Sequence, residues 1–223
     1  MEFIDFLKKS AFKDLDTSGH ILDLQGWVNH GFSETLRVIT EELKNKKEVM
    51  VFEVGSWKGA SASRICSHLK NEKVDVHSVV CIDTWLGAPE FLTWGLNDPT
   101  RGVSLAHVNG YPSIFYTFTK NMKCLNNDDI IAPFPMASVQ AADVLKHYKI
   151  MADVMYIDGS HEYRAVMTDL EEFKDLLKPG GILWGDDYDH HWPGVMRAVA
   201  EFSIKYGFTL KVTGNNWTMR SRV

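Results

Sequence analysis

Apolar and polar residues follow two alternating patterns along the chain. Short runs of consecutive apolar residues stand at 49–54, 77–82, 153–157 and 182–184. Runs without polar alternation are typical of parallel strands buried on both faces. Between them, apolar residues at helical spacing predict helices at 26–44, 60–69, 116–125, 138–148, 161–177 and 195–206. A short strand near residue 130 and terminal strands at 208–212 and 216–220 complete the predicted order.

The regular alternation of strand and helix predicts the α/β class. We expect a Rossmann-like, doubly wound, mainly parallel sheet with helices on both faces and antiparallel C-terminal strands. A length of 223 residues suits a single domain over residues 1–223. Its first part, 1–45, is expected to be helical, and its apolar residues could pack on the same domain or on a second subunit of a homo-oligomer.

Residues 86–120 differ from the rest because glycine, proline and aromatic residues, among them Trp94, occur there without a sustained period. Long irregular segments inside compact domains usually bind ligands or cover sites. We therefore expect this segment to form a lid over an active site.

The composition of the chain excludes several classes of binding partner. The net charge of −5, without a dense Lys/Arg cluster, argues against nucleic acid. No segment has the order of a signal peptide or the length of a membrane span, so a cytoplasmic protein without a membrane partner is expected. The 3 cysteines are widely spaced, which favours buried thiols in a reducing compartment over disulfides or a zinc site.

Acidic residues and a glycine turn follow the predicted parallel strands. The strand ends carry Glu53-Val-Gly55, Asp83, Asp158 and Asp186-Asp187. One acid at a strand end often only caps the next helix. Four such ends converge on one edge of a parallel sheet, where ligands bind in this class of fold. The sequence therefore predicts a binding site there.

The first turn indicates the kind of cofactor. Gly55 and Gly59 leave backbone N–H groups free at a helix N-terminus, and Asp83 is placed to accept hydrogen bonds from a ribose diol. Both NAD and S-adenosylmethionine (SAM) contain such a diol. The dinucleotide fingerprint G-x-G-x-x-G requires a middle glycine, and Trp57 stands in its place. An acidic edge also repels a polyphosphate, so SAM fits better.

With these residues in place, the chain resembles the class I SAM-dependent methyltransferases over about residues 26–192. It looks most similar to the branch of macrocin- and mycinamicin-type sugar O-methyltransferases. The resemblance rests on the order and spacing of four motifs: Glu53-Val-Gly-Ser-Trp-Lys-Gly59, Ile82-Asp-Thr-Trp-Leu-Gly87, Tyr156-Ile-Asp-Gly-Ser-His161 and Leu177-Lys-Pro-Gly-Gly-Ile-Leu-Trp-Gly-Asp-Asp-Tyr188.

The resemblance implies a set of cofactor-binding residues: Glu53, Gly55, Ser56, Gly59, Asp83, Thr84, Trp85, Ser138 and Asp158. Within this set, the first turn would hold the methionine and ribose side of SAM. Asp83 would hold the ribose hydroxyls, Trp85 would wall off the adenine, and Ser138 would contact the adenine edge.

A metal site is implied by the same resemblance. Asp158, Asp186 and Asp187 match the acids that hold a divalent cation in metal-dependent O-methyltransferases, including the catechol type. Three neighbouring carboxylates repel one another, whereas Mg²⁺ prefers oxygen ligands. A diol could replace metal-bound waters and become more acidic. The alternative is that these acids only cap helices or fix loops.

His161 occupies a position that can carry the general base in the resembling family, with Asp158 as its catalytic neighbour. An imidazole has a suitable pKa for accepting a hydroxyl proton. His190 and His191 could serve instead, or could line the acceptor pocket.

The expected function is methyl transfer from SAM to a hydroxyl of a sugar, another small polyol or a phenol, with Mg²⁺ as a second cofactor. Three alternatives remain open from the residues alone. They are a SAM-fold binding or assembly protein without catalysis, a nicotinamide-dependent oxidoreductase, and a metal-dependent hydrolase or hydroxylase.

Overall fold

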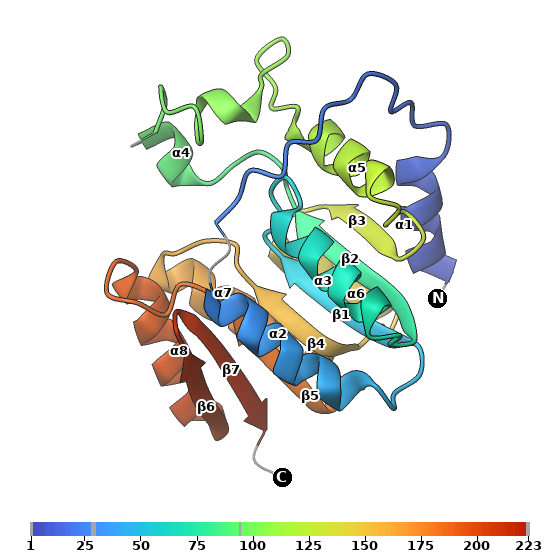
Figure 1. Ribbon diagram of the computed structural model, residues 1–223. Coiled ribbons are helices and arrows are strands. Elements are labelled where there is room, and N and C mark those ends of the chain that lie inside the picture. The colour runs from blue at the N-terminus through green and yellow to red at the C-terminus, as the bar shows by residue number, and fades with distance from the viewer. Residues whose placement is uncertain (1, 28–29, 94, 222–223) are drawn as a thin grey trace.

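A computed structural model of the chain describes residues 2–27, 30–93 and 95–221. Within them, one sheet has the strand order β3-β2-β1-β4-β5-β7-β6 (Figure 1). The strands are β1 (Val49–Val54), β2 (Val76–Asp83), β3 (Ile131–Pro135), β4 (Ala152–Ile157), β5 (Leu177–Gly185), β6 (Phe208–Thr213) and β7 (Asn216–Ser221). Strands β1 to β5 pair in parallel, and β7 runs antiparallel to β5 and β6. The predicted Rossmann-like fold is confirmed.

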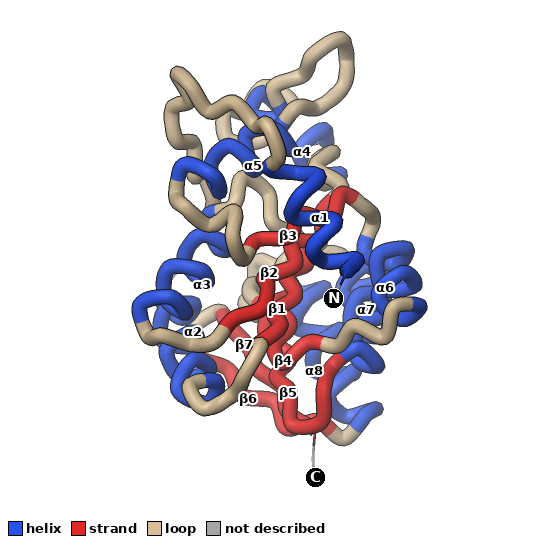
Figure 2. Tube along the Cα trace, turned by 90° about the vertical axis from the view of Figure 1, so that its right-hand side faces the viewer, coloured by secondary structure: helices blue, strands red, loops and turns tan. Residues whose placement is uncertain are grey.

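Helices cover both faces of the sheet, as Figure 2 shows edge-on. One face carries α2 (His30–Leu43), α3 (Ala60–Asn71) and α5 (Ile114–Cys124), and the other carries α6 (Ser138–His147), α7 (Tyr163–Phe173) and α8 (Pro193–Tyr206). Successive residues of β1 alternate between the two cores, with Val51 in one and Phe52 in the other. All six residues of β1 are buried, as expected for an apolar run without alternation.

Helix α1 (Glu2–Phe12) covers the edge strand β3. Its Ile4 packs in the core of the α6 side, while Phe12 packs in the core of the α3 side. The ring of Phe3 stacks on Tyr148 with centroids 4.7 Å apart. The N-terminal helix therefore packs on its own domain, where it protects an exposed strand edge.

The predicted helix at 26–44 begins at His30 rather than at Gly26, because residues 15–27 form a non-helical strap. The buried ammonium group of Lys58 pairs with Asp23 of the strap at 2.6 Å. The side-chain amide of Asn121 on α5 donates to the carbonyl oxygens of both residues, at 2.9 and 2.7 Å. These tertiary bonds fix the strap in an extended path that apolar periodicity does not reveal.

The lid consists of residues 86–113, between β2 and α5, and contains α4 (Pro89–Thr93) and the 3₁₀ turn η1 (Val103–Leu105) (Figure 1). The predicted lid extended to residue 120, but residues 114–120 belong to α5 and bury Phe118 in the core. Trp94 lies outside the described residues. Backbone hydrogen bonds close the lid on itself, for example from Ser113 to Leu105 at 3.0 Å.

None of the helices in the described residues is long and apolar enough to cross a membrane.

Candidate functional site

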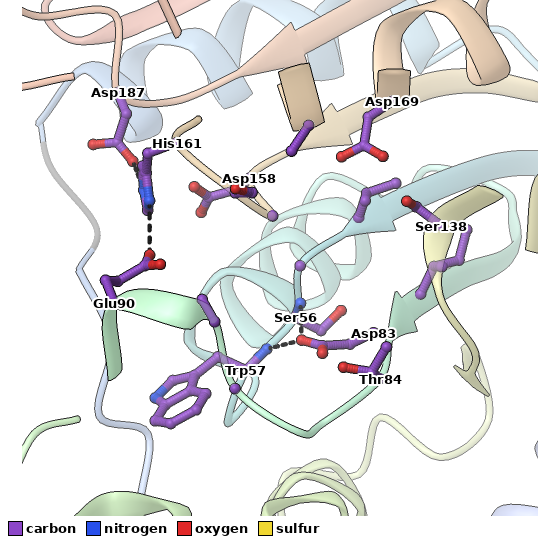
Figure 3. Close-up of a pocket in the computed structure, with 18 of the residues that line it drawn as sticks. Ser56, Trp57, Asp83, Thr84, Glu90, Ser138, Asp158, His161, Asp169 and Asp187 are labelled. Atoms are coloured by element: carbon purple, nitrogen blue, oxygen red, sulfur yellow. Dashed lines mark hydrogen bonds and ion pairs between the residues drawn. The ribbon is translucent and has the colours of Figure 1, made fainter. Parts of the chain in front are cut away.

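A cavity of about 1010 Å³ opens at the carboxyl ends of β1, β2 and β4. The turn after β1, the loop after β3, the first turns of α7, the strap and the lid all contribute to its wall. Figure 3 shows two polar groups at opposite ends, with His161 and Asp187 at one end and Ser138 and Asp169 at the other. The predicted convergence of strand ends on one site is therefore present in the structure.

The two glycines of the first turn have different roles. Gly55 has φ +88°, and a Cβ atom there would overlap the carbonyl oxygen of Asp158. Only glycine allows the chains after β1 and β4 to cross so closely. Gly59, at φ +91°, instead lies against Met122 and Phe118 of α5 and does not line the cavity. The missing side chain lets α3 pack against α5 at this point.

Asp83 holds the turn together from the end of β2. One of its carboxylate oxygens accepts the backbone N–H groups of Ser56 and Trp57, both at 2.9 Å (Figure 3). The other oxygen accepts the backbone N–H of Trp85 at 2.7 Å. Burial raises the pKa of Asp83, and hydrogen bonds from the backbone N–H groups of Trp85, Trp57, Ser56 and Thr84 oppose that rise. Asp83 and Thr84 both line the cavity.

Glu53 lies behind the turn and does not line the cavity. Its side chain is fully buried, which raises its pKa to about 7. The Ser56 hydroxyl donates to Oε2 at 2.6 Å, and Oε1 has no hydrogen-bond partner among the described residues. Glu53 thus supports the turn from below, whereas Ser56 itself reaches the cavity.

Trp85 does not wall the cavity as expected. Its indole is only 1% exposed and packs against Phe115 and Phe118 of α5. The indole N–H donates to the carbonyl oxygen of Trp57 at 2.8 Å. The backbone at Trp85 has φ +53°, and the ring lies in the core beneath the turn. Trp85 therefore braces the cofactor turn from the protein side.

At the other end of the cavity, ligand atoms of Asp158, His161 and Asp187 all lie within 4.8 Å of one another. Nε2 of His161 hydrogen-bonds Asp187 at 2.7 Å, and Nδ1 hydrogen-bonds Glu90 of the lid at 3.1 Å (Figure 3). Its ring stacks on Trp192 with centroids 3.9 Å apart. Burial disfavours the imidazolium, but the two carboxylates outweigh it and raise the pKa of His161 to about 10.

Asp158 lies deeper in the same wall, where the Tyr156 hydroxyl donates to it at 3.0 Å. Burial raises the pKa of Asp158 well above its usual range, and the charges of Asp187 and Asp186 add to that rise. The group is therefore short of positive charge, which His161 supplies in this structure.

Asp186, the third metal ligand implied by the resemblance, lines a small cavity together with Asp158, His161 and Asp187, but it is not among the three side chains whose ligand atoms lie within 4.8 Å of one another. Its Oδ1 accepts the backbone N–H of Asp187 at 2.8 Å and the side-chain amide of Asn216 at 3.0 Å. Asp187 adopts φ +61°, so the chain turns sharply between the two carboxylates. Asp186 therefore fixes the loop that presents Asp187 to the cavity.

Two site residues escaped the sequence analysis. Glu90 stands in a lid without periodicity, so no pattern marks it. Asp169 is only 6% exposed, and burial raises its pKa to about 6 against a hydrogen bond from Ser138. An acid next to Leu170 on the apolar face of α7 was a visible signal.

His191 lines the cavity mouth, and with Asp189 and His190 it forms a separate exposed group.

The strand order, with ligand-binding groups at the carboxyl ends of β1, β2 and β4, is that of a Rossmann-like cofactor-binding domain. The family model described as "Methyltransferase domain" matches residues 52–188, and the chain belongs to that family. It is a SAM-dependent methyltransferase, which excludes the nicotinamide-dependent oxidoreductase considered from the sequence. A comparison with curated proteins finds no significant sequence match.

Solved structures with the same fold include several O-methyltransferases. The O-methyltransferase NovP superposes with a TM-score of 0.62 at 17% identity, covering 100% of this chain and 99% of that one. A putative caffeoyl-CoA O-methyltransferase from Staphylococcus aureus gives 0.59 at 12% identity, with coverages of 98% and 92%. The O-methyltransferase from Bacillus cereus in complex with SAH gives 0.56 at 10% identity, with coverages of 98% and 91%. At these identities the likeness supports the fold.

Proposed function

We propose that this enzyme is a divalent-metal-dependent O-methyltransferase that acts on a hydroxyl of a small ring-shaped acceptor, a sugar or a phenol. One observation carries the proposal. The Asp158, His161 and Asp187 group lies in the wall of the same cavity as the cofactor turn, so an acceptor there would lie next to the cofactor's methyl group.

The donors of this group fit a hard divalent cation such as Mg²⁺. Asp158 and Asp187 offer carboxylate oxygens on one side of a water-accessible cavity, which suits a cation that keeps several waters. Burial, and then the charges of Asp187 and Asp186, raise the pKa of Asp158, and a bound cation would favour its ionised form. When bound, Mg²⁺ would supply Lewis acidity that lowers the pKa of an acceptor hydroxyl. We assign Asp158 and Asp187 as its protein ligands.

In this structure the carboxylates of Asp187 and Glu90 hold His161 in its protonated form. A cation at Asp158 and Asp187 would neutralise the charge that holds the Nε2 proton, and we propose that Nε2, once freed, accepts the proton of the acceptor hydroxyl. Glu90 accepts a hydrogen bond from Nδ1, and Trp192 covers one face of the ring, so the imidazole is held in one orientation. As the new C–O bond forms, the C–S bond of the sulfonium breaks and the hydroxyl proton moves to Nε2. Alignment of the hydroxyl with the methyl group supplies a large part of the acceleration.

Aromatic side chains in the cavity wall favour a ring-shaped acceptor. Trp27 of the strap, Trp57 of the turn and Phe91 of the lid line the cavity, with Trp57 and Phe91 in an edge-to-face contact at 4.7 Å. Aromatic walls stack equally well on a sugar face and on a planar phenol. Arg101 of the lid lies over the Trp27 ring at 5.5 Å and holds strap and lid together.

The test is an activity screen with SAM against hydroxylated sugars and catechols, read as release of S-adenosylhomocysteine, with Mg²⁺ or with a chelator. We expect turnover only with the metal. Asp187→Asn and Asp158→Asn should each reduce it by on the order of 100-fold while SAM affinity by calorimetry stays within about threefold. Asp143→Asn, at an exposed acid on α6, is the charge-matched control.

Two results would overturn the assignment. One is turnover of a hydroxyl acceptor that the chelator does not change. The other is an Asp187→Asn variant that loses SAM binding and turnover together, because that would place Asp187 in the cofactor half of the cavity.

A further inference from the structure

The exposed group of Asp189, His190 and His191 is a second place where side chains of metal-binding type meet. Their ligand atoms all lie within 4.8 Å of one another, on the loop between β5 and α8. The rings of the two histidines contact each other with centroids 3.9 Å apart. The methyl transfer proposed above uses none of these three side chains.

The carboxylate of Asp189 is held in place by its surroundings. Its Oδ2 accepts a hydrogen bond from the side-chain amide of Asn215 at 2.7 Å, and its Oδ1 accepts the backbone N–H of His191 at 2.7 Å. The backbone N–H of Tyr188 also donates to the carbonyl oxygen of Asn215 at 2.8 Å, so the turn between β6 and β7 holds the loop. A donor that is already fixed lowers the entropic cost of binding an ion.

The two imidazoles are free to adjust to an ion. Nδ1 of His191 lies 3.1 Å from Oδ1 of Asp189. A carboxylate that bonds one ring nitrogen orients the ring and leaves the other nitrogen for a metal. The side chain of His191 is 71% exposed, and His190 is exposed as well. Both rings can therefore rotate without disturbing the packing of the domain.

The composition of this group selects a class of cation. Imidazole nitrogens suit Zn²⁺, Cu²⁺ and Ni²⁺, whereas Mg²⁺ prefers oxygen ligands. The exposed group has two imidazoles and one carboxylate, while the group of Asp158, His161 and Asp187 has two carboxylates and one imidazole. Three protein ligands leave one position of a tetrahedral Zn²⁺ for water. The two groups therefore favour different cations.

The group lies next to the methyl-transfer site. His191 lines the mouth of the cavity, and its neighbour Trp192 stacks on His161 with centroids 3.9 Å apart. The backbone N–H of Asp189 donates to the carbonyl oxygen of Asp187 at 2.8 Å. An ion bound to the exposed group would therefore fix the loop that carries both Asp187 and Trp192.

We propose that Asp189, His190 and His191 form a binding site for a transition-metal ion of the Zn²⁺, Cu²⁺ and Ni²⁺ class, separate from the hard-cation site in the cavity. The inference goes beyond the proposed function, because it requires neither Mg²⁺ nor a methyl acceptor.

The first test is a calorimetric titration of Zn²⁺ into the full chain in excess Mg²⁺. His190→Gln and His191→Gln should each weaken Zn²⁺ binding at least about tenfold, because each removes one of three ligands. His161→Gln makes the same substitution in the cavity, and His147→Gln makes it at the exposed end of α6. Both controls should leave the Zn²⁺ affinity unchanged.

Cu²⁺ gives a second measurement, because its electron paramagnetic resonance spectrum shows hyperfine coupling to bound nitrogen. One equivalent of Cu²⁺ should show two imidazole nitrogens in the wild-type enzyme and in His161→Gln. A single imidazole nitrogen should remain in His190→Gln and in His191→Gln. The Tm of these two variants without metal should equal that of the wild type, since both rings are exposed.

The proposal is overturned if the wild-type enzyme does not bind Zn²⁺, or if neither His190→Gln nor His191→Gln changes the affinity. A loss of Zn²⁺ binding in His161→Gln alone would also overturn it, because that result places the ion in the cavity. These measurements involve neither SAM nor turnover. A failure here therefore leaves the Mg²⁺ dependence of turnover untested and unaffected, and the two proposals fail separately.

Discussion

Gly55 lies directly against the backbone of Asp158, so closely that a Cβ atom on Gly55 would overlap the Asp158 carbonyl oxygen. The turn that approaches the cofactor and the strand end that carries the proposed metal ligand thus form one packed unit. The amide N–H of Asp158 donates to the carbonyl oxygen of Val54 at 2.8 Å and fixes their separation. Any change that moves one half of the site will move the other.

Gly55→Ala should therefore impair both halves of the site. The substitution adds the clash with Asp158 to the strain of a positive φ, which alone costs about 1 kcal/mol. We expect a loss of SAM affinity of more than tenfold by calorimetry and a lower Tm. Gly180→Ala is the matched control, because Gly180 has φ +71° with no atom within 4 Å of the added Cβ. Equal effects of the two variants would show that the close contact has no importance of its own.

The strap should depend on the ion pair between Asp23 and Lys58. The Lys58 side chain is 7% exposed and that of Asp23 is 45% exposed. Asp23→Asn leaves a buried ammonium group without its counter-ion, and should lower the free energy of unfolding by about 1–3 kcal/mol. Lys58→Met leaves an acid that water can solvate, and should cost less. Urea unfolding of both variants and of the double variant measures the coupling.

The outcome that contradicts this prediction is a Lys58→Met variant as unstable as Asp23→Asn. SAM affinity gives a second measurement, because Gly26 and Trp27 of the strap line the cavity. Both variants should weaken SAM binding, and Asp23→Asn should weaken it more than Lys58→Met, as it does stability.

Glu53 should make stability depend on pH. Burial raises its folded-state pKa to about 7, above its ordinary value of 4.5. The folded chain therefore binds the proton more tightly, so the destabilisation is absent below about pH 4.5, grows as the pH rises to 7, and is then constant. Its upper limit is on the order of 3 kcal/mol.

Glu53→Gln removes this ionisation and keeps an oxygen that can accept the Ser56 hydroxyl hydrogen bond. The difference in unfolding free energy between variant and wild type should shift in favour of the variant between pH 5 and pH 8. Denaturant titrations at the two pH values provide the measurement. A constant difference across that range would show that Glu53 does not titrate there.

Asp186 and Asp187 should respond differently to the same substitution. Asp187 faces the cavity, whereas Asp186 accepts hydrogen bonds from the loop and from Asn216. Asp187→Asn should weaken Mg²⁺ binding by at least about tenfold more than Asp186→Asn, which should chiefly lower the Tm. Calorimetric titration of Mg²⁺ into each variant, with SAM present, compares them. A larger loss of Mg²⁺ affinity in Asp186→Asn would restore Asp186 to the ligand set.

The sheet and the main cavity were predictable because both depend on short-range patterns. Buried apolar runs marked strands β1, β2, β4 and β5, and acids at their ends converge wherever parallel strands lie side by side. Asp83 and Asp158 reached the cavity for this reason. The direction in which a side chain at a turn points does not follow from such patterns. For this reason the sequence did not show that Trp85 points into the core and not into the cavity. Its positive φ and its contacts with α5 arise only when the tertiary structure forms.

Contacts between residues that are distant in the sequence could not be predicted from it either. Glu90 reaches His161 across 71 positions, and Asn121 ties the strap across 98. Asp169 is the exception, because an acid on the apolar face of a helix was readable in the sequence and signals a buried partner or ligand. The site could thus be located from the sequence, but its complete set of residues could not.

The lid leaves the sheet after β2 and returns at α5, and its turns are closed by hydrogen bonds within the segment. Among the described residues of 86–93 and 95–113, none pairs with a strand of the sheet. An insertion or replacement there can therefore alter the acceptor wall while the register that positions Gly55, Asp83 and Asp158 stays the same. For enzyme engineering, this segment is therefore a place to change the cavity wall while the cofactor turn is kept, provided that an acid remains at the position of Glu90 to hold His161.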